Sequence, residues 1–266
     1  MPSWCLIVLV AEGTAGDPTR ALIAKAVTNY EAAQRQLGEF LFDRRVRRRK
    51  LDAQGQVREE SSVVLRRELI EDIPITRAVE RNGRPLSEQE LAEQRKSIDK
   101  ALAEYRKLSA KEQAERRQSV SVTGNREMEF LREMPEALDY RYLGSEWVEG
   151  REILRFALQP RPGYKARSLA GKIFSHVEGE LWIEKQAAEM VRLDVVVTSD
   201  TTLGGILAKV EKGTEFHLSR RRVEDVYLPH HLRIRFGTTV LLVKAIRQET
   251  ESDYVYYRRW RSPAAN

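Results

Sequence analysis

Apolar and polar residues alternate along most of the chain, a pattern typical of strands that bury one face. It begins at residues 40–47, where Phe40 and Phe42 fall on one side and Leu41 and Asp43 on the other. Turn residues separate this segment from the next, so a hairpin is expected. The predicted strands are residues 40–47, 57–70, 73–80, 139–149, 152–159, 178–184, 189–198, 203–211, 214–223, 232–243 and 245–260.

Helical spacing of apolar residues is confined to a few segments. The longest is highly charged and begins at a capping box formed by Ser87 and Glu90. A later one is expected to stop before Pro135, because the residue before a proline disfavours helical geometry. The predicted helices are residues 19–37, 88–117, 126–134 and 168–176.

Strands in succession with few helices predict an α+β fold. We expect a single domain over residues 16–266, with a large curved antiparallel sheet of about 10–11 strands, an incomplete β-barrel, and covering helices. A charged helical excursion at about 87–134 would leave the main body. The concave side would hold either a core or a ligand cavity. Candidates to line or support that cavity are Phe40, Phe42, Leu154, Phe156, Leu181, Ile183, Val195, Phe216, Leu218, Ile234 and Phe236.

Composition narrows the class of protein. Charged residues make up 32% of the 266 residues and hydrophobic residues 41%, which excludes a polytopic membrane protein and wholesale disorder. Mean hydropathy is −0.52. With Cys5 as its one cysteine, the chain can form no internal disulfide.

The N-terminus predicts export. Residues 4–11 are continuously apolar and small residues follow, so residues 1–15 are interpreted as a signal peptide and the protein as periplasmic. This signal is atypical, since no Lys or Arg precedes Arg20. The alternative is a buried N-terminal strand.

Candidate catalytic chemistry is sparse. His176, His217, His230 and His231 are scattered, and no HExxH, GxSxG, GxGxxG or P-loop motif occurs. We therefore predict no catalytic residues, no metal and no cofactor, and a protein that is not an enzyme.

The strongest charge feature lies at residues 44–50, where six of seven residues are cationic. Adjacent strand residues point to opposite faces, so half of this cluster would point inward or toward acidic neighbours. We favour an ordinary cross-strand ladder with acidic residues of the hairpin. The alternative is contact with an anionic partner through Arg44, Arg45, Arg47, Arg48 and Arg49.

Several blocks carry a family resemblance: residues 47–57, 81–87, 160–164, 179–184 and 226–229. They resemble uncharacterised exported bacterial proteins grouped with the outer-membrane lipoprotein-sorting superfamily, the LolA/LolB-like proteins. The resemblance covers about residues 30 to 260. It implies an incomplete barrel whose apolar interior accepts acyl chains of lipoproteins or other lipids. No ligand-binding residue carries over by motif.

Three functional hypotheses follow. The first is a non-catalytic periplasmic protein that binds or carries lipid or lipoprotein acyl chains. The second is a structural, interaction or stress-sensing protein of the envelope with a filled core, using residues 88–117 as a docking arm for an envelope protein. An anionic membrane surface is a further candidate partner. The third, nucleic-acid binding through residues 44–50, requires cytosolic retention, so no nucleic acid is expected.

Overall fold

The computed structural model describes residues 17–118, 125–203, 208–240 and 244–260. The elements are α1 (Pro18–Gln36), η1 (Leu37–Glu39), β1 (Phe40–Leu51), β2 (Val57–Ile70), β3 (Ile73–Arg81), β4 (Arg84–Pro85), α2 (Glu88–Arg106), α3 (Ala110–Gln118), α4 (Asn125–Ala137), β5 (Leu138–Val148), β6 (Arg151–Pro160), η2 (Ala170–His176), β7 (Val177–Glu184), β8 (Glu189–Val197), β9 (Thr201–Leu203), β10 (Ala208–Val210), β11 (Glu215–Val223), β12 (Val226–Val240) and β13 (Lys244–Arg259). Strands follow one another along most of the chain, with helices at the front and between β4 and β5, much as the periodicity predicts.

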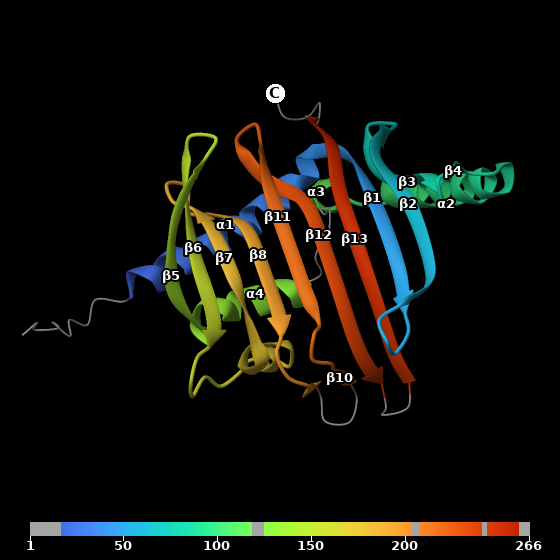
Figure 1. Cartoon of the computed structure of the whole chain (residues 1–266). Coiled ribbons are helices and arrows are strands. Elements are labelled where there is room, and N and C mark those ends of the chain that lie inside the picture. Colours follow the sequence, from blue (N-terminus) through green and yellow to red (C-terminus); the bar gives the residue numbers. More distant parts are fainter. Residues whose placement is uncertain (1–16, 119–124, 204–207, 241–243, 261–266) are drawn as a thin grey trace, which may run out of the picture.

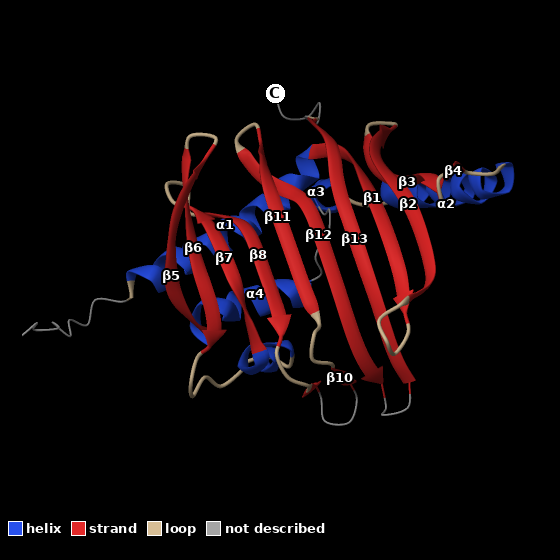
Figure 2. Cartoon of the chain, viewed as in Figure 1, coloured by secondary structure: helices blue, strands red, loops and turns tan. Residues whose placement is uncertain are grey.

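The strands form one antiparallel sheet in the order β4-β3-β2-β1-β13-β12-β11-β8-β7-β6-β5, with β10 pairing β12 and β9 pairing β10. The sheet is not closed, and Figures 1 and 2 show it curved, with α1 and α4 lying behind it. These features confirm the α+β class and the large curved sheet. The described residues form 13 strands, more than the sequence predicts, because β4 and the division into β9 and β10 were not anticipated.

Helix α1 covers the concave face because its apolar stripe faces the sheet. The Asp17 carboxylate accepts a hydrogen bond from the backbone nitrogen of Thr19, and Pro18 occupies the first turn, so the helix start is well capped. Ile23 and Ala26 are fully buried. The predicted helix over residues 19–37 is confirmed.

The predicted single helix over residues 88–117 is wrong, because it is two helices. The Ser87 and Glu90 capping box starts α2 as expected. A second capping box follows, in which Ser109 Oγ accepts from the Glu112 nitrogen at 3.3 Å and the Glu112 carboxylate accepts from the Ser109 nitrogen at 2.8 Å. This pair starts α3, because it satisfies backbone groups that a continuous helix would have paired internally.

The predicted helix end before Pro135 is also wrong, since α4 continues to Ala137. Proline in the last turn removes only one backbone hydrogen bond. Tertiary contacts compensate, because Met134 and Ala137 are buried and Arg20 of α1 donates to the Pro135 carbonyl.

Two strand predictions need correction. Residues 203–211 do not form one strand, since β9 and β10 pair antiparallel with each other. Strand β12 starts six residues before the expected residue 232 and passes through Pro229. The register with β11 shifts between Ser219 and Arg220 at that point, and a bulge tolerates a residue without an N–H. Residues 241–243, the expected end of this strand, lie outside the described residues, as does the signal peptide predicted at residues 1–15.

Directly paired residues on neighbouring strands share a face, so the concave side can be followed in rows across the sheet. One row joins Leu232, Leu218, Leu193, Leu181 and Phe156 on consecutive strands from β12 to β6. Most of these residues belong to the larger hydrophobic core beneath α1 and α4. A second core lies under the end of α1 and contains Phe40, Phe42 and Tyr254.

Replacing a residue at the centre of this row tests the core assignment. Leu181→Ala should lower the free energy of unfolding by about 2–5 kcal/mol, because it leaves a cavity in a fully buried site. The control Leu143→Ala, at a side chain that is 38% exposed, should change it by about 0.5 kcal/mol or less. Urea unfolding followed by circular dichroism measures both. Similar losses for the two variants would contradict the assignment.

Candidate ligand cavity

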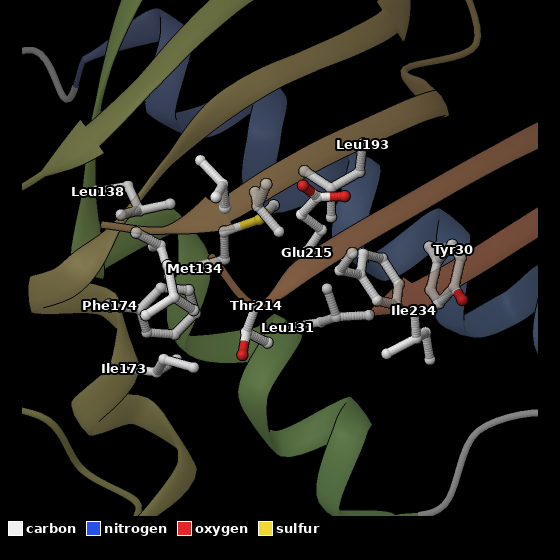
Figure 3. A pocket seen from close by; sticks show the side chains of 15 residues that line it. Tyr30, Leu131, Met134, Leu138, Ile173, Phe174, Leu193, Thr214, Glu215 and Ile234 are labelled. Atoms are coloured by element: carbon white, nitrogen blue, oxygen red, sulfur yellow. The ribbon is translucent and has the colours of Figure 1, made fainter. Parts of the chain in front are cut away.

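A cavity of about 240 Å³ lies between the concave face of the sheet and α1, α4 and η2. From the sheet, β8 and β11 contribute Val195 and Phe216, and β12 contributes Ile234. From the helices come Tyr30 of α1 and Phe174 of η2. Figure 3 shows Phe174 toward one end of the cavity and Tyr30 with Ile234 toward the other.

The polar groups at the cavity are already engaged. Thr214 Oγ1 accepts from the nitrogen of Gly237 at 3.3 Å. The Glu215 carboxylate accepts from Arg233 at 3.1 Å and lies 3.4 Å from His217. Apart from the hydroxyl of Tyr30, the remaining lining is hydrocarbon and aromatic, so the cavity suits an apolar group.

The structure brings only part of the predicted set together at this cavity. Val195, Phe216 and Ile234 line it. The others lie on the sheet but elsewhere. The larger core contains Phe156, Leu181, Ile183 and Leu218, and Leu154 packs against it. The second core contains Phe40 and Phe42. On β12, Phe236 is half-buried two residues beyond Ile234.

The sequence reasoning missed the helical side of the cavity. That side is lined by Leu131 and Met134 of α4 together with Ile173 and Phe174 of η2. Alternation identifies which side of a strand is buried, but it does not say which helix covers it. The signal available was the apolar spacing of Leu131 and Met134, three residues apart on one helix face.

A buried carboxylate fixes the wall that contains Ile173 and Phe174. Glu133 of α4 is 5% exposed, and its Oε2 accepts from Tyr164 Oη at 2.6 Å and from the Arg167 nitrogen at 3.0 Å. A Cβ on Gly171 would lie 2.2 Å from the same oxygen, so a side chain at this position would displace the Glu133 carboxylate from these contacts. Glu133 thereby holds the segment leading into η2 against α4.

These contacts also set the ionisation of the carboxyl group. Burial disfavours the charged form, but hydrogen bonds from Ser168, Tyr164 and the Arg167 backbone outweigh it and lower the pKa of Glu133. Because the pKa of Glu133 is lower in the folded state than in the unfolded state, its charged carboxylate stabilises the fold at pH values above the unfolded-state pKa. That stabilisation is lost as the pH falls through the folded-state pKa.

The arginines of β1 divide between the two faces of the sheet. Arg49 pairs with Glu60 at 2.8 Å and Glu249 at 2.6 Å. Arg47 lies 3.9 Å from Glu60 and 3.6 Å from Glu251. These pairs form the expected ladder, on the convex face.

The remaining arginines of the cluster have different surroundings. Arg45, also convex, donates to Tyr256 Oη at 3.4 Å. Arg44 is concave and donates to Ser252 Oγ at 3.3 and 3.1 Å. Arg48 is concave and exposed. Within the described part of the chain, neither Arg44 nor Arg48 forms an ion pair.

Two of the four histidines, His217 and His231, lie beside carboxylates, whereas His176 contacts Ser199 Oγ at 2.7 Å. His217 Nδ1 lies 3.1 Å from Asp194, and His231 Nδ1 lies 2.8 Å from Asp253. Among residues 17–118, 125–203, 208–240 and 244–260, no group of three or more potential ligands is arranged to hold a metal ion. None of the described helices combines the length and apolar character needed to traverse a bilayer.

No protein-family model matches the chain, and no curated protein matches it significantly. Among solved structures, the chain is similar to a DUF1329 family protein from Desulfovibrio piger, with 11% identity over 94% of this chain and 95% of that one and a TM-score of 0.31. A LolA superfamily protein from Nitrosomonas europaea is 11% identical over 92% and 94%, with a TM-score of 0.28. An outer-membrane lipoprotein-sorting protein domain from Vibrio parahaemolyticus is 9% identical over 92% and 96%, with a TM-score of 0.32.

The last two names belong to the group that the sequence blocks resemble. Identities and TM-scores this low carry no functional information, so function is inferred from the cavity.

Removing the charge of Glu133 should loosen the cavity wall. We expect Glu133→Gln to lower the free energy of unfolding by about 1–3 kcal/mol and to speed tryptic cleavage at Lys165 and Arg167. In urea unfolding, the wild type should lose stability in the same way as the pH falls below 4.5, the usual carboxyl pKa, because protonation removes the hydrogen bonds to the carboxylate. The matched control is Glu136→Gln, which loses only an exposed 3.5 Å pair with Arg161. Equal cleavage of both variants would refute the anchoring role.

Proposed function

We propose that the protein binds an acyl chain in this cavity, as a non-catalytic lipid or lipoprotein binding or carrier protein of the bacterial envelope. The observation that carries the proposal is a largely apolar cavity of about 240 Å³, at which the side chains of Thr214 and Glu215 are already hydrogen-bonded. Each methylene group removed from water is worth about 0.8 kcal/mol, so a lined cavity of this kind favours alkyl chains.

The size of the cavity supports an occupant larger than a solvent molecule. An engineered apolar cavity of about 150 Å³ stays dry and accepts benzene. The cavity here is larger, at about 240 Å³, and equally poor in free polar groups. Water would find few hydrogen-bond partners in it, whereas a hydrocarbon chain would gain contacts on all sides.

The envelope location rests on the sequence. The apolar residues 4–11 and the small residues after them support export to the periplasm. The resemblance to exported lipoprotein-sorting proteins points the same way. An acyl-chain partner fits such a compartment, because lipids crossing it must be shielded from water.

Helix α2, the first part of the predicted excursion, plays no part in the cavity, whereas α4 at its end packs on the main body and lines the cavity through Leu131 and Met134. Helix α2 lies along the edge strand β3, where Gln94 donates to the Ala78 carbonyl at 3.0 Å and Glu90 pairs with Arg81 at 3.0 Å. No residue of α2 lines the cavity. Its use as a docking arm for an envelope protein stays a prediction, which deletion of residues 88–117 would test.

Filling the cavity tests the proposal. Ile173→Trp adds a large side chain to the wall and should lower affinity for decanol at least tenfold, measured by calorimetry. Leu169→Trp, at a 51% exposed site just before η2, is the matched control and should bind normally. Phe216→Asp places a charge at mid-sheet and should abolish binding.

The outcomes separate clearly. Circular dichroism confirms that each variant is folded before its binding is interpreted. Normal decanol binding by folded Ile173→Trp and Phe216→Asp would show that the chain does not enter this cavity. Mass spectrometry of organic extracts from protein purified out of the periplasm gives a second measurement, with a stoichiometric lipid as the expected result.

A further inference from the structure

Two arginines of β1 lie on the same face of the sheet as the cavity. Arg48 pairs across the strands with Thr250 of β13, Thr250 with Ile234 of β12, and Ile234 with Phe216 of β11. Directly opposed residues in antiparallel strands point to the same side. Arg48 therefore belongs to the row that continues into the cavity wall, and its Cα lies two strand spacings, about 10 Å, from that of Ile234.

The surroundings of these arginines are neutral. The residues paired with Arg44 are Leu65 and Tyr254, and those paired with Arg48 are Ser61 and Thr250. Arg44 stacks on the Tyr254 ring at 5.3 Å and donates to Ser252. Within the described residues no carboxylate lies within 4.0 Å of either guanidinium, in contrast to Arg47 and Arg49 of the same strand.

Arg44 and Arg48 differ from Arg47 and Arg49 in the side chains that neighbour them across the strands. On the convex side the sequence provides a carboxylate for Arg47 and Arg49 on neighbouring strands. On the concave side the residues paired with Arg44 and Arg48 carry hydroxyl or apolar side chains instead, and the nearest concave carboxylate along β2, Glu59, is paired with Lys50 at 2.6 Å. Arg44 and Arg48 are therefore left without a carboxylate on the face that also carries the cavity, while Arg45 on the convex face contacts Tyr256 instead of a carboxylate. Figure 1 shows the lower ends of β12, β13 and β1 extending beyond α1 and α4, so this part of the face is not covered by them.

We propose that Arg44 and Arg48 bind the anionic head of an amphiphile whose alkyl chain occupies the cavity. The proposal rests on the function proposed above and extends it to the class of ligand. The head would be a phosphate or a carboxylate, since guanidinium groups bind both through paired hydrogen bonds. The hydroxyls of Ser61 and Thr250 stand beside Arg48 and can donate to the same oxygens. The chain would then pass over Ile234 toward Phe216.

The geometry matches the shape of such a ligand. Tyr30 and Ile234 lie at the same end of the cavity in Figure 3. Ile234 is also the cavity residue nearest to Arg48 along the row. Polar, hydroxyl and apolar side chains thus follow one another along a single row, in the order of head, neck and tail of a lipid.

The test compares decyl phosphate with decanol on the full chain by calorimetry. Wild type should bind decyl phosphate about tenfold more tightly, because charge-assisted hydrogen bonds add to burial of the same chain. Arg48→Gln should remove that advantage and leave decanol affinity unchanged. Arg47→Gln is the matched control: it removes one positive charge from the same strand but on the convex face, so the advantage should persist.

Each contrary result has a separate meaning. If decanol binds but decyl phosphate binds no more tightly, or if the advantage survives in Arg48→Gln, the head-group site is wrong while the cavity proposal stands. If Arg47→Gln loses as much as Arg48→Gln, the effect is general electrostatics and the site is again wrong. Inorganic phosphate that competes as well as decyl phosphate would overturn the amphiphile assignment. Failure of decanol to bind would overturn the proposed function itself.

Discussion

The pairing of β1 with β13 is the contact on which the rest of the molecule depends. It joins the first hairpin to strands formed some 200 residues later, as in the bond between Arg44 and Ser252, which are 208 residues apart. Salt bridges such as Arg49 with Glu249 and the packing of Phe42 on Tyr254 reinforce it. Without this seam, strands β2 to β4 would have no sheet to extend. Contacts of such long range must overcome a large loop-closure entropy, which the many paired residues along both strands offset.

The same seam places charge beside hydrocarbon. On the β13 side of this pairing, strands β12, β11, β8, β7 and β6 present leucine, valine and phenylalanine to α1 and α4. Strand β1 adds arginine to that face. Helices cover only part of the concave side, so the fold combines a filled core, a small cavity and an open polar margin on one continuous surface. A shorter sheet could supply a core or a binding surface, but it would have less room for both.

Much of the fold follows from local patterns, and the exceptions have specific causes. Alternation located β5 to β8 to within a residue or two, because one face of each is buried. The break between α2 and α3 depended on a second capping box at Ser109, and the start of β12 on a bulge that accommodates Pro229. The cavity was harder to predict, because the side chains of α4 and η2 decide which sheet residues face empty space. Leu181 and Leu193 are paired on the same face of neighbouring strands, yet only Leu193 lines the cavity.

Strand β1 is irregular at both ends: its pairing shifts between Leu41 and Asp43 against β13, and between Lys50 and Leu51 against β2. Between these points strict alternation sends Arg47 and Arg49 outward and Arg44 and Arg48 inward. Inserting or deleting one residue there would exchange the two sets and drive the ion-paired side chains into the interior. A two-residue change would leave both faces intact. The segment can therefore vary in length only by even steps, a parity rule imposed by charge as much as by hydrophobicity.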